Sequence, residues 1–322
     1  MDSLLSAASL SRDDVERLLR SARTHLAGGG RRHPDALVAL LFFDASLRTR
    51  VGFEAAAARL GARTTTTTEL RRAPSMEVAE AVEDAARSIA PWCDAICLRH
   101  ADAGVPARVA GLVGTPVVNC GNGGDEHPSQ ALADLFAIAE RRGRIDGVRV
   151  TVVGDLHGMR AVHSLVLLLA RFDDVSVRCV APPGCGLPER FAAAFRAAGG
   201  ELVEHERLAV ADADVLYVAG LPAITSAGRL APAERRRYLV TRATLAQLPA
   251  HAEVLCPLPR VDEIARDVDE LPQAGYFRQS ALALGMRMAV LDELLTRDGD
   301  GAGAGARQPG SGTPAPAGTK TS

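Results

Sequence analysis

Short apolar runs, each about the length of a buried strand, alternate along this chain with segments of helical periodicity. Alternation of this kind is typical of parallel sheets that are covered by helices. We therefore predict an α/β fold with two doubly wound parallel-sheet domains. The expected strands are 37–43, 94–99, 115–120, 148–154, 176–181, 215–219 and 253–256. The expected helices are 51–60, 77–90, 105–113, 131–142, 189–198, 231–238 and 280–295, with a further one that ends at Leu169.

The N-terminal segment predicts a capped helix. Ser11 is a suitable N-cap with Asp14 near the third helical position, and Gly28–Gly30 ends the helical pattern. Further on, Thr64–Thr68 is a run of β-branched residues that is typical either of a strand or of a polar link.

Composition and charge exclude several classes of function. At 322 residues the chain suits two domains of ordinary size. A net charge of −2 offers no electrostatic reason to bind nucleic acid or an acidic membrane surface. No apolar run approaches the roughly 20 residues of a membrane-spanning helix, and the N-terminus lacks the basic segment of a signal peptide. The single lysine, Lys320, lies in the tail, so no lysine within the fold can serve a site.

The cysteines and glycines argue against a metal or a nucleotide cofactor. The six cysteines lack the paired spacing of metal ligands, which indicates reduced thiols in a cytoplasmic protein, with a zinc site as the alternative. The glycines after the strand at 148–154 do not form a dinucleotide-binding fingerprint, so we expect no nicotinamide cofactor. The cysteines are Cys93, Cys97, Cys120, Cys179, Cys185 and Cys256.

The turn after the first predicted strand is the most informative stretch. Residues 44–46 break the apolar run and a helix follows, which places free backbone N–H groups and the positive end of a helix at one point. Ser46 and Thr49 add hydroxyls, and Arg48 adds a planar fork of N–H donors. Such a turn attracts a phosphate. The alternative is an ordinary helix N-cap followed by solvated arginines.

Three later stretches also place polar groups beside predicted strands. Residues 119–130 form a glycine-rich loop at the carboxyl end of a strand, where open α/β sheets bind ligands. His127 lies in this loop, and a core or capping histidine is its alternative interpretation. Arg160 opens a helix and is either a ligand-binding or a solvated arginine. Pro257–Pro259 predicts an extended backbone with exposed carbonyls.

These stretches resemble the aspartate and ornithine carbamoyltransferase family, closest to the catalytic chain of the aspartate type. The resemblance covers the chain from about residue 10 to about residue 295, with the motifs in the family's order. The motifs are FFDASLRTRVGFE at 42–54, HPSQ at 127–130, GDL at 154–156 with RAVHSL at 160–165, and PLPRVDEI at 257–264.

The resemblance implies a fold, a reaction and an assembly. The expected reaction moves the carbamoyl group of carbamoyl phosphate to an amine acceptor without a cofactor, in a homotrimer with sites between subunits. Residues 1–134 would bind carbamoyl phosphate, completed by a C-terminal helix at 280–297 that returns to them. Residues 135–279 would bind the acceptor, and 298–322 are predicted to be disordered because they lack apolar periodicity.

The resemblance also assigns roles in binding the carbamoyl donor. Ser46, Arg48 and Thr49 would hold the phosphate. Thr49, Arg99 and His127 would polarise the carbonyl oxygen as it becomes an oxyanion.

Four further residues take roles by the same resemblance: Gln130 would bind carbamoyl phosphate, and Arg160, Pro257 and Leu258 would bind the acceptor. Gln130 and the backbone carbonyls of Pro257 and Leu258 would orient the carbamoyl amide and the acceptor amine. Arg160 would bind the α-carboxylate of an amino-acid acceptor.

Two departures affect the donor half. Leu47 replaces a hydroxyl residue of the family's phosphate loop. The family's mobile loop, which reaches a neighbouring subunit's site, carries a lysine that is absent from the corresponding stretch 76–82, although Glu80 matches. Arg71 and Arg72 lie just upstream and are either substitutes for the lysine or surface charge.

The acceptor half departs further. Gly220 and Pro222 occupy the positions of an arginine and a glutamine of the aspartate type, and Cys256 stands where that type has histidine. We therefore expect a carbamoyltransferase with an altered acceptor. The first alternative is a non-catalytic or regulatory paralogue that retains the fold and phosphate binding. The second is the ordinary aspartate reaction performed with substitute residues, or different chemistry on the same scaffold.

Overall fold

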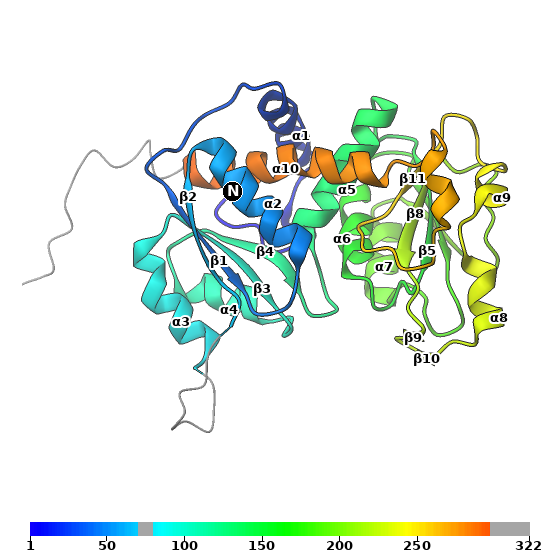
Figure 1. Ribbon diagram of the computed structural model, residues 1–322, viewed down its shortest axis with the longest axis horizontal. Coiled ribbons are helices and arrows are strands. Elements are labelled where there is room, and N and C mark those ends of the chain that lie inside the picture. The colour runs from blue at the N-terminus through cyan, green and yellow to red at the C-terminus, as the bar shows by residue number, and fades with distance from the viewer. Residues whose placement is uncertain (70–79, 297–322) are drawn as a thin grey trace, which may run out of the picture.

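The computed structural model describes residues 1–69 and 80–296, which form two parallel sheets with helices packed against them (Figure 1). The first sheet has the strand order β2-β1-β3-β4. Its apolar centre, β1, is flanked by both neighbours: Val38 pairs with Thr64 on one side and with Ala95 on the other. The strands are β1 (Leu37–Phe42), β2 (Arg63–Thr67), β3 (Ala95–His100) and β4 (Val117–Asn122).

The second sheet has five parallel strands in the order β11-β8-β5-β6-β7. Helices lie between β5 and β6, between β6 and β7, and between β8 and β11, whereas the chain passes from β7 to β8 through the irregular segment 206–214. The strands are β5 (Arg149–Gly154), β6 (Ser176–Val180), β7 (Glu201–His205), β8 (Val215–Gly220) and β11 (Glu253–Leu255). A short antiparallel pair, β9 (Ile224–Thr225) and β10 (Gly228–Arg229), lies outside this sheet. The prediction of two doubly wound parallel-sheet domains is confirmed for the described residues.

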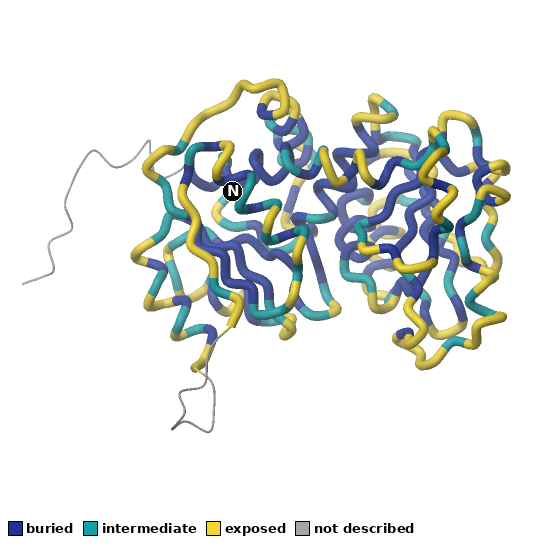
Figure 2. The backbone as a smooth tube through the Cα atoms, in the orientation of Figure 1, coloured by how far each residue is buried: buried dark blue, intermediate teal, exposed yellow. Residues whose placement is uncertain are grey.

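Helices cover both sheets, and the inner strands are buried, whereas the edge strands β2 and β7 are largely exposed (Figure 2). The α-helices are α1 (Arg12–Leu26), α2 (Leu47–Leu60), α3 (Val82–Ile89), α4 (Val105–Leu112), α5 (Pro128–Arg142), α6 (Arg160–Leu169), α7 (Glu189–Ala197), α8 (Pro232–Arg235), α9 (Arg242–Leu245) and α10 (Tyr276–Thr296). Four 3-10 helices connect them, namely η1 (Ala7–Ser9), η2 (Ala90–Trp92), η3 (Arg236–Tyr238) and η4 (Arg266–Glu270).

Several element boundaries differ from the sequence predictions. The helix α2 begins at Leu47 rather than Val51, so the candidate phosphate residues lie on its first turn. The run at 64–68 is a strand, β2, on the sheet edge. The edge strand β7 was not predicted, because four of its five residues are exposed and leave no apolar run. The predicted helix 77–90 is shorter, beginning at Val82, and its residues 77–79 lie outside the described part of the chain.

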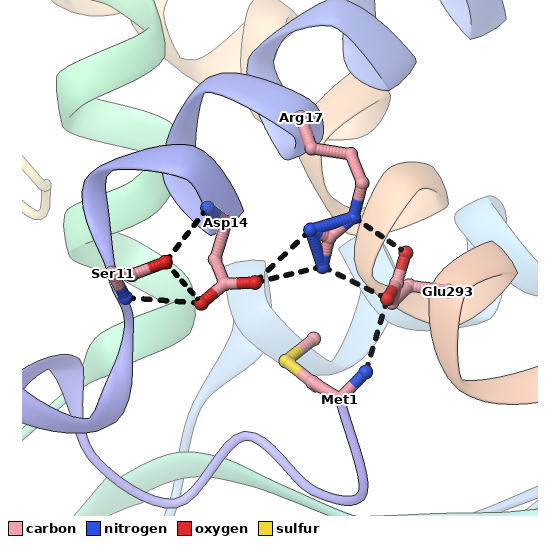
Figure 3. A network of polar contacts seen from close by, with 5 residues as sticks. All are labelled: Met1, Ser11, Asp14, Arg17 and Glu293. Carbon is pink, nitrogen blue, oxygen red and sulfur yellow. Dashed lines mark hydrogen bonds and ion pairs between the residues drawn. The ribbon is translucent and has the colours of Figure 1, made fainter.

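The long helix α10 connects the two lobes, packing against α1, α2 and α5 (Figure 1). Gly285 allows the close approach of α1, because a Cβ at this position would lie 2.5 Å from Leu26 Cγ and 2.9 Å from the Ala22 carbonyl oxygen. The predicted capping box of α1, between Ser11 and Asp14, is present. Arg17 donates to Asp14 and to Glu293 and so links α1 to α10 (Figure 3). Glu293 also accepts a hydrogen bond from the amino group of Met1 at 3.0 Å.

Within residues 1–69 and 80–296, all six cysteines are free thiols, and no three His, Cys, Asp or Glu side chains form a group that could hold a metal ion. In the same residues no helix has both the length and the apolar character needed to cross a membrane. Two predicted segments lie outside the described residues. They are the loop at 69–76, of which Glu69 alone is described, and the tail 298–322; Arg71 and Arg72 belong to that loop.

Candidate active site

All of the predicted site residues line one cleft of about 530 Å³. The cleft lies at the carboxyl ends of strands from both sheets, where the chain leaves β1, β3, β4, β5 and β11. Its lining residues are Ala45, Ser46, Leu47, Arg48, Thr49, Arg99, Gly123, His127, Gln130, Gly158, Met159, Arg160, Ala161, Pro257, Leu258 and Pro259. The structure therefore brings together side chains that are more than 200 positions apart in the printed sequence.

The turn from β1 into α2 forms one wall of the cleft. Ser46 is the N-cap of α2 but makes no side-chain capping hydrogen bond, so its hydroxyl is not used by its own helix. Arg48 and Thr49 lie on the first turn, where the unpaired N–H groups and the helix dipole favour an anion. Thr49 is buried, whereas Leu47 is 67 % exposed, so Leu47 replaces a polar group without packing into the core.

Arg99 is a buried guanidinium at the end of β3 that holds the turn in place. It donates to the carbonyl oxygens of Asp44 (3.2 Å), Ala45 (3.3 Å) and Cys120 (3.1 Å), and it pairs with the Asp44 carboxylate at 2.9 Å. Burial and the neighbouring Arg160 lower the pKa of Arg99 to about 10, with Asp44 opposing them. At neutral pH the cleft therefore contains a fixed, partly desolvated cation.

His127 lies immediately before α5 and is neutral at pH 7. Burial, with Arg160, Arg99 and Arg287 acting in the same direction, lowers the pKa of His127 well below its usual value. Its Nε2 lies 3.4 Å from Thr49 Oγ1, and its Nδ1 lies 3.3 Å from Ser129 Oγ. A neutral imidazole has one N–H, so it can donate a hydrogen bond to an oxygen in the cleft without acting as an acid.

Arg160 is neither solvated nor free at the start of α6. Its Nη1 donates to the Gly123 carbonyl oxygen at 2.5 Å, and its Nη2 lies 3.3 Å from Asp44 Oδ2. Asp44 thus pairs with two arginines from different lobes, Arg99 on β3 and Arg160 on α6. Sequence reasoning treated Asp44 only as the residue that ends the strand; its place within the first motif was the signal that could have identified it.

The segment after β11 corrects one prediction. Leu258 has a φ of +54°, so the backbone at Pro257–Pro259 is not extended throughout as we predicted. The prediction was wrong because the rule for residues before proline describes local sterics alone. In the folded chain the Leu258 N–H turns back toward Cys256 Sγ at 3.4 Å, and Pro257, Leu258 and Pro259 still line the cleft.

Two buried charged residues behind the cleft escaped sequence reasoning. Asp134 on α5 is fully buried and accepts a hydrogen bond from Gln130 Nε2 at 2.7 Å. Arg287 on α10 is 6 % exposed, stacks over the Phe53 ring at 5.8 Å, and has its pKa lowered by burial. Gly52 makes room for it, since a Cβ there would lie 2.4 Å from Arg287 Nη1. Both residues lie on apolar helices, where no local pattern distinguishes them.

The two sheets and the arginine-rich cleft between them define a two-domain α/β protein built to bind an anion. Residues 2–140 match the carbamoyl-P binding domain of aspartate/ornithine carbamoyltransferases, and residues 146–294 match the Asp/Orn binding domain of the same proteins. The chain therefore belongs to the aspartate/ornithine carbamoyltransferase family.

Individual relatives agree with this assignment. The chain is 38 % identical to the aspartate carbamoyltransferase catalytic subunit of Halorubrum lacusprofundi, over 93 % of this chain and 97 % of that protein. It is 36 % identical to the chloroplastic aspartate carbamoyltransferase of Oryza sativa subsp. japonica, over 91 % of this chain and 82 % of that protein.

Solved structures show the same fold. The catalytic subunit of M. jannaschii aspartate transcarbamoylase is similar with a TM-score of 0.84 and 34 % identity, covering 94 % of this chain and all of that one. The Trypanosoma cruzi aspartate transcarbamoylase, solved in complex with carbamoyl phosphate and aspartate, is similar with a TM-score of 0.81 and 30 % identity, covering 90 % and 94 %.

Proposed function

We propose that this protein is a carbamoyltransferase that moves the carbamoyl group of carbamoyl phosphate to the amine of an amino-acid-like acceptor. The observation that carries the proposal is the convergence of Arg48, Thr49, Arg99 and His127 in one cleft. In the reaction the amine nitrogen attacks the carbamoyl carbon, the bond from that carbon to the phosphate oxygen breaks, and phosphate leaves. The nitrogen loses one proton, which the leaving phosphate takes up as hydrogen phosphate.

The donor half of the cleft has the groups that this reaction needs. Ser46, Arg48 and Thr49 surround the positive end of α2, which supports binding of the phosphate and of the charge that develops on it as it leaves. Arg99, neutral His127 and the Thr49 hydroxyl would stabilise the carbonyl oxygen in the transition state. Catalysis would be electrostatic and positional, since these groups are held before the ligand arrives.

The acceptor half would be formed by Arg160 and by the carbonyls of Pro257 and Leu258. Arg160 reaches the cleft from the start of α6, and Asp44 contacts one of its guanidinium nitrogens at 3.3 Å. An α-carboxylate of the acceptor would compete with Asp44 for this arginine. The two carbonyls would accept the N–H groups of the incoming amine, which orients its lone pair toward the carbamoyl carbon.

The surroundings of Gly220 support an acceptor other than aspartate. The atoms nearest to a Cβ built at Gly220 are Met159 Cε at 3.6 Å and Glu263 Oε1 at 3.8 Å. The guanidinium of Arg235 is nearby, but it donates to the Leu221 carbonyl oxygen and pairs with Asp262. Glu263 therefore presents a carboxylate to this position, while the Arg235 guanidinium is already engaged within the protein. A second carboxylate on the acceptor would be repelled here, whereas a neutral or cationic side chain would be accepted.

A catalytically inactive or regulatory paralogue is the second candidate. Leu47 exposes an apolar side chain at the phosphate loop. Residues 1–319 contain no lysine that could bind a phosphate in this cleft. These features favour a protein that keeps the fold and phosphate binding without turnover.

A panel of amines separates the two candidates. Carbamoyl phosphate is expected to be consumed at least about tenfold faster with an α-amino acid of neutral or cationic side chain than with aspartate. Phosphate release is the measurement, with Arg48→Ala as the control against contaminating enzymes. Fastest turnover with aspartate would contradict the altered acceptor site. Phosphate binding without turnover of any amine would favour the inactive paralogue.

We also place the two halves of the reaction on the two lobes. Residues 1–134, with the C-terminal helix at 280–297, would bind carbamoyl phosphate, and 135–279 would bind the acceptor. The packing of α10 against α1 and α2 supports the return of this helix to the first lobe. The reduced state of all six cysteines supports a cytoplasmic location.

The protein is expected to form a homotrimer with sites at its subunit interfaces. Leu47 and Val51 lie one helical turn apart on α2, next to the cleft, and are 67 % and 46 % exposed. An apolar pair of this kind supports a neighbouring subunit there. Light scattering during size-exclusion chromatography measures the mass directly, and a monomer at micromolar concentration would contradict the trimer.

A further inference from the structure

Asp134 is the most completely buried carboxylate behind the cleft, and it connects three parts of the fold. It is 0 % exposed. Its Oδ1 accepts hydrogen bonds from Gln130 Nε2 at 2.7 Å and from Gln279 Nε2 at 2.6 Å. Its Oδ2 accepts one from the Tyr217 hydroxyl at 2.7 Å. These partners come from α5 itself, from α10 and from β8, so Asp134 lies where both lobes meet.

The orientation of the Gln279 amide is determined by the backbone. The Cys256 N–H lies 2.9 Å from Gln279 Oε1, and a backbone N–H can only donate. Gln279 must therefore turn its oxygen to Cys256 and its NH₂ group to Asp134. This contact also ties the carboxylate to the segment that leads into Pro257 and Leu258.

The orientation of the Gln130 amide follows from the carboxylate. An ionised carboxylate can only accept hydrogen bonds, so Gln130 must direct its NH₂ group at Asp134. Asp134 takes one of the two N–H donors, so Oε1 is the acceptor atom that Gln130 offers to the cleft, which it lines, beside the second N–H. An acceptor atom at this place pairs with an N–H of a ligand and with no carbonyl, ester or carboxylate oxygen.

The geometry points to Asp134 as a positioning residue that fixes Gln130 as a hydrogen-bond acceptor and so selects an acyl phosphate that bears an NH₂ group. This inference rests on the proposed function. The inference adds to the proposed function a reason why the cleft binds carbamoyl phosphate more tightly than an acyl phosphate of the same shape that has a methyl group in place of NH₂. A site built to pair with an N–H discriminates strongly against a ligand that lacks it.

Protonation of Asp134 should weaken this selection. Burial raises the pKa of Asp134 to about 6, although its three donors and Arg287 oppose the shift. The other titratable groups that act on it are Tyr217, which donates to it, and Cys256. Once protonated, the carboxyl group can donate, and the Gln130 amide is then free to turn around. The selection is therefore expected above pH 6 and is expected to fall as the pH drops through this value.

The test measures ligand binding and needs no turnover. Phosphonoacetamide carries the NH₂ group, and 2-oxopropylphosphonate has a methyl group in its place. Calorimetry at pH 8 is expected to show at least about tenfold tighter binding of phosphonoacetamide to the wild type. Asp134→Leu and Gln130→Met are each expected to reduce this ratio to near one. The double variant is expected to reduce it no further, because Asp134 acts through Gln130.

Three measurements keep the result interpretable. Inorganic phosphate should bind all variants with similar affinity, which shows that the phosphate loop is intact. Asp214 is a buried carboxylate just before β8, at the end of this strand away from the cleft, and it pairs with Arg142 at 2.7 Å. Asp214→Leu should therefore leave the ratio of the two affinities unchanged. Asp134→Asn retains an acceptor oxygen for both glutamines, so it should keep the preference and hold it from pH 8 to pH 5. This variant still decides the question if Asp134→Leu fails to fold.

Each alternative outcome has a distinct meaning. Phosphate binding to the wild type without a preference for phosphonoacetamide would overturn the selection by Asp134 but not the donor site. A preference that survives Asp134→Leu, or losses that multiply in the double variant, would overturn the action through Gln130. If neither phosphonate nor phosphate binds the wild type, both this inference and the proposed function fail.

Discussion

Replacing Arg48 with alanine is expected to weaken the binding of inorganic phosphate and carbamoyl phosphate by at least about a hundredfold. The guanidinium lies on the first turn of α2 and lines the cleft. Two charge-assisted hydrogen bonds to a phosphate contribute roughly 1.5–3 kcal/mol each, and a loss of about 2.8 kcal/mol corresponds to a hundredfold change in Kd. Because this cation would hold the phosphate itself, turnover should fall with the affinity.

The matched control is Arg59→Ala. Arg59 is an exposed arginine in the last turn of the same helix, away from the cleft. Its loss changes the net charge by the same amount but should leave phosphate affinity within about twofold, since exposed charges act weakly at a distance in salt. Calorimetric titration of both variants with phosphate measures the difference. Equal affinities of Arg48→Ala and wild type would remove Arg48 from the site.

The second large effect is expected for Arg99→Met, which should lower kcat/KM on the order of a thousandfold. Loss of one oxyanion donor costs about 10²- to 10³-fold in other enzymes. Arg99 also anchors the turn, because it donates to the carbonyl oxygens of Asp44 and Ala45. Without it Asp44 would have only Arg160 as its partner, so Arg160 would be less available to the acceptor. Both kcat and KM for the acceptor should therefore change.

Arg178→Met is the control for this variant. Arg178 is also a strand arginine, on β6, and its guanidinium pairs with Asp212 at 2.6 Å on the surface of the second lobe. Losing it removes a similar ion pair without touching the cleft. Steady-state kinetics on both proteins, with thermal unfolding to confirm their folding, should separate them. A fall of less than tenfold for Arg99→Met would show that Arg99 has no part in stabilising the reacting group.

Much of the fold was predictable because its strands are apolar on consecutive positions. The strands β1 and β5 are buried along nearly their whole length, and this produces runs that stand out in the sequence. The edge strand β7 produces no such run, since four of its five residues are exposed and it pairs with another strand on one side alone. Its pairing with β6 is a non-local contact, and local patterns do not report it.

The site was predictable where its chemistry lies within single turns. Ser46, Arg48 and Thr49 are close in sequence, and the strand-to-helix turn that presents them is a local structure. His127 and Gln130 lie in another such turn. The prediction failed for Leu258, whose positive φ depends on how the segment after β11 meets its neighbours. Asp44 and Asp134 were missed because their partners lie on other elements.

Residue order alone was enough to establish the alternation of strands and helices, the anion-attracting turn, and the side chains available for chemistry. These properties depend on neighbours within a few positions, where sterics, helix geometry and hydroxyl or guanidinium chemistry act directly. Packing decided the protonation and orientation of those side chains. Neutral His127, the Asp44 bridge between Arg99 and Arg160, and the amide polarity of Gln130 arise only when desolvation and distant donors meet in one buried place.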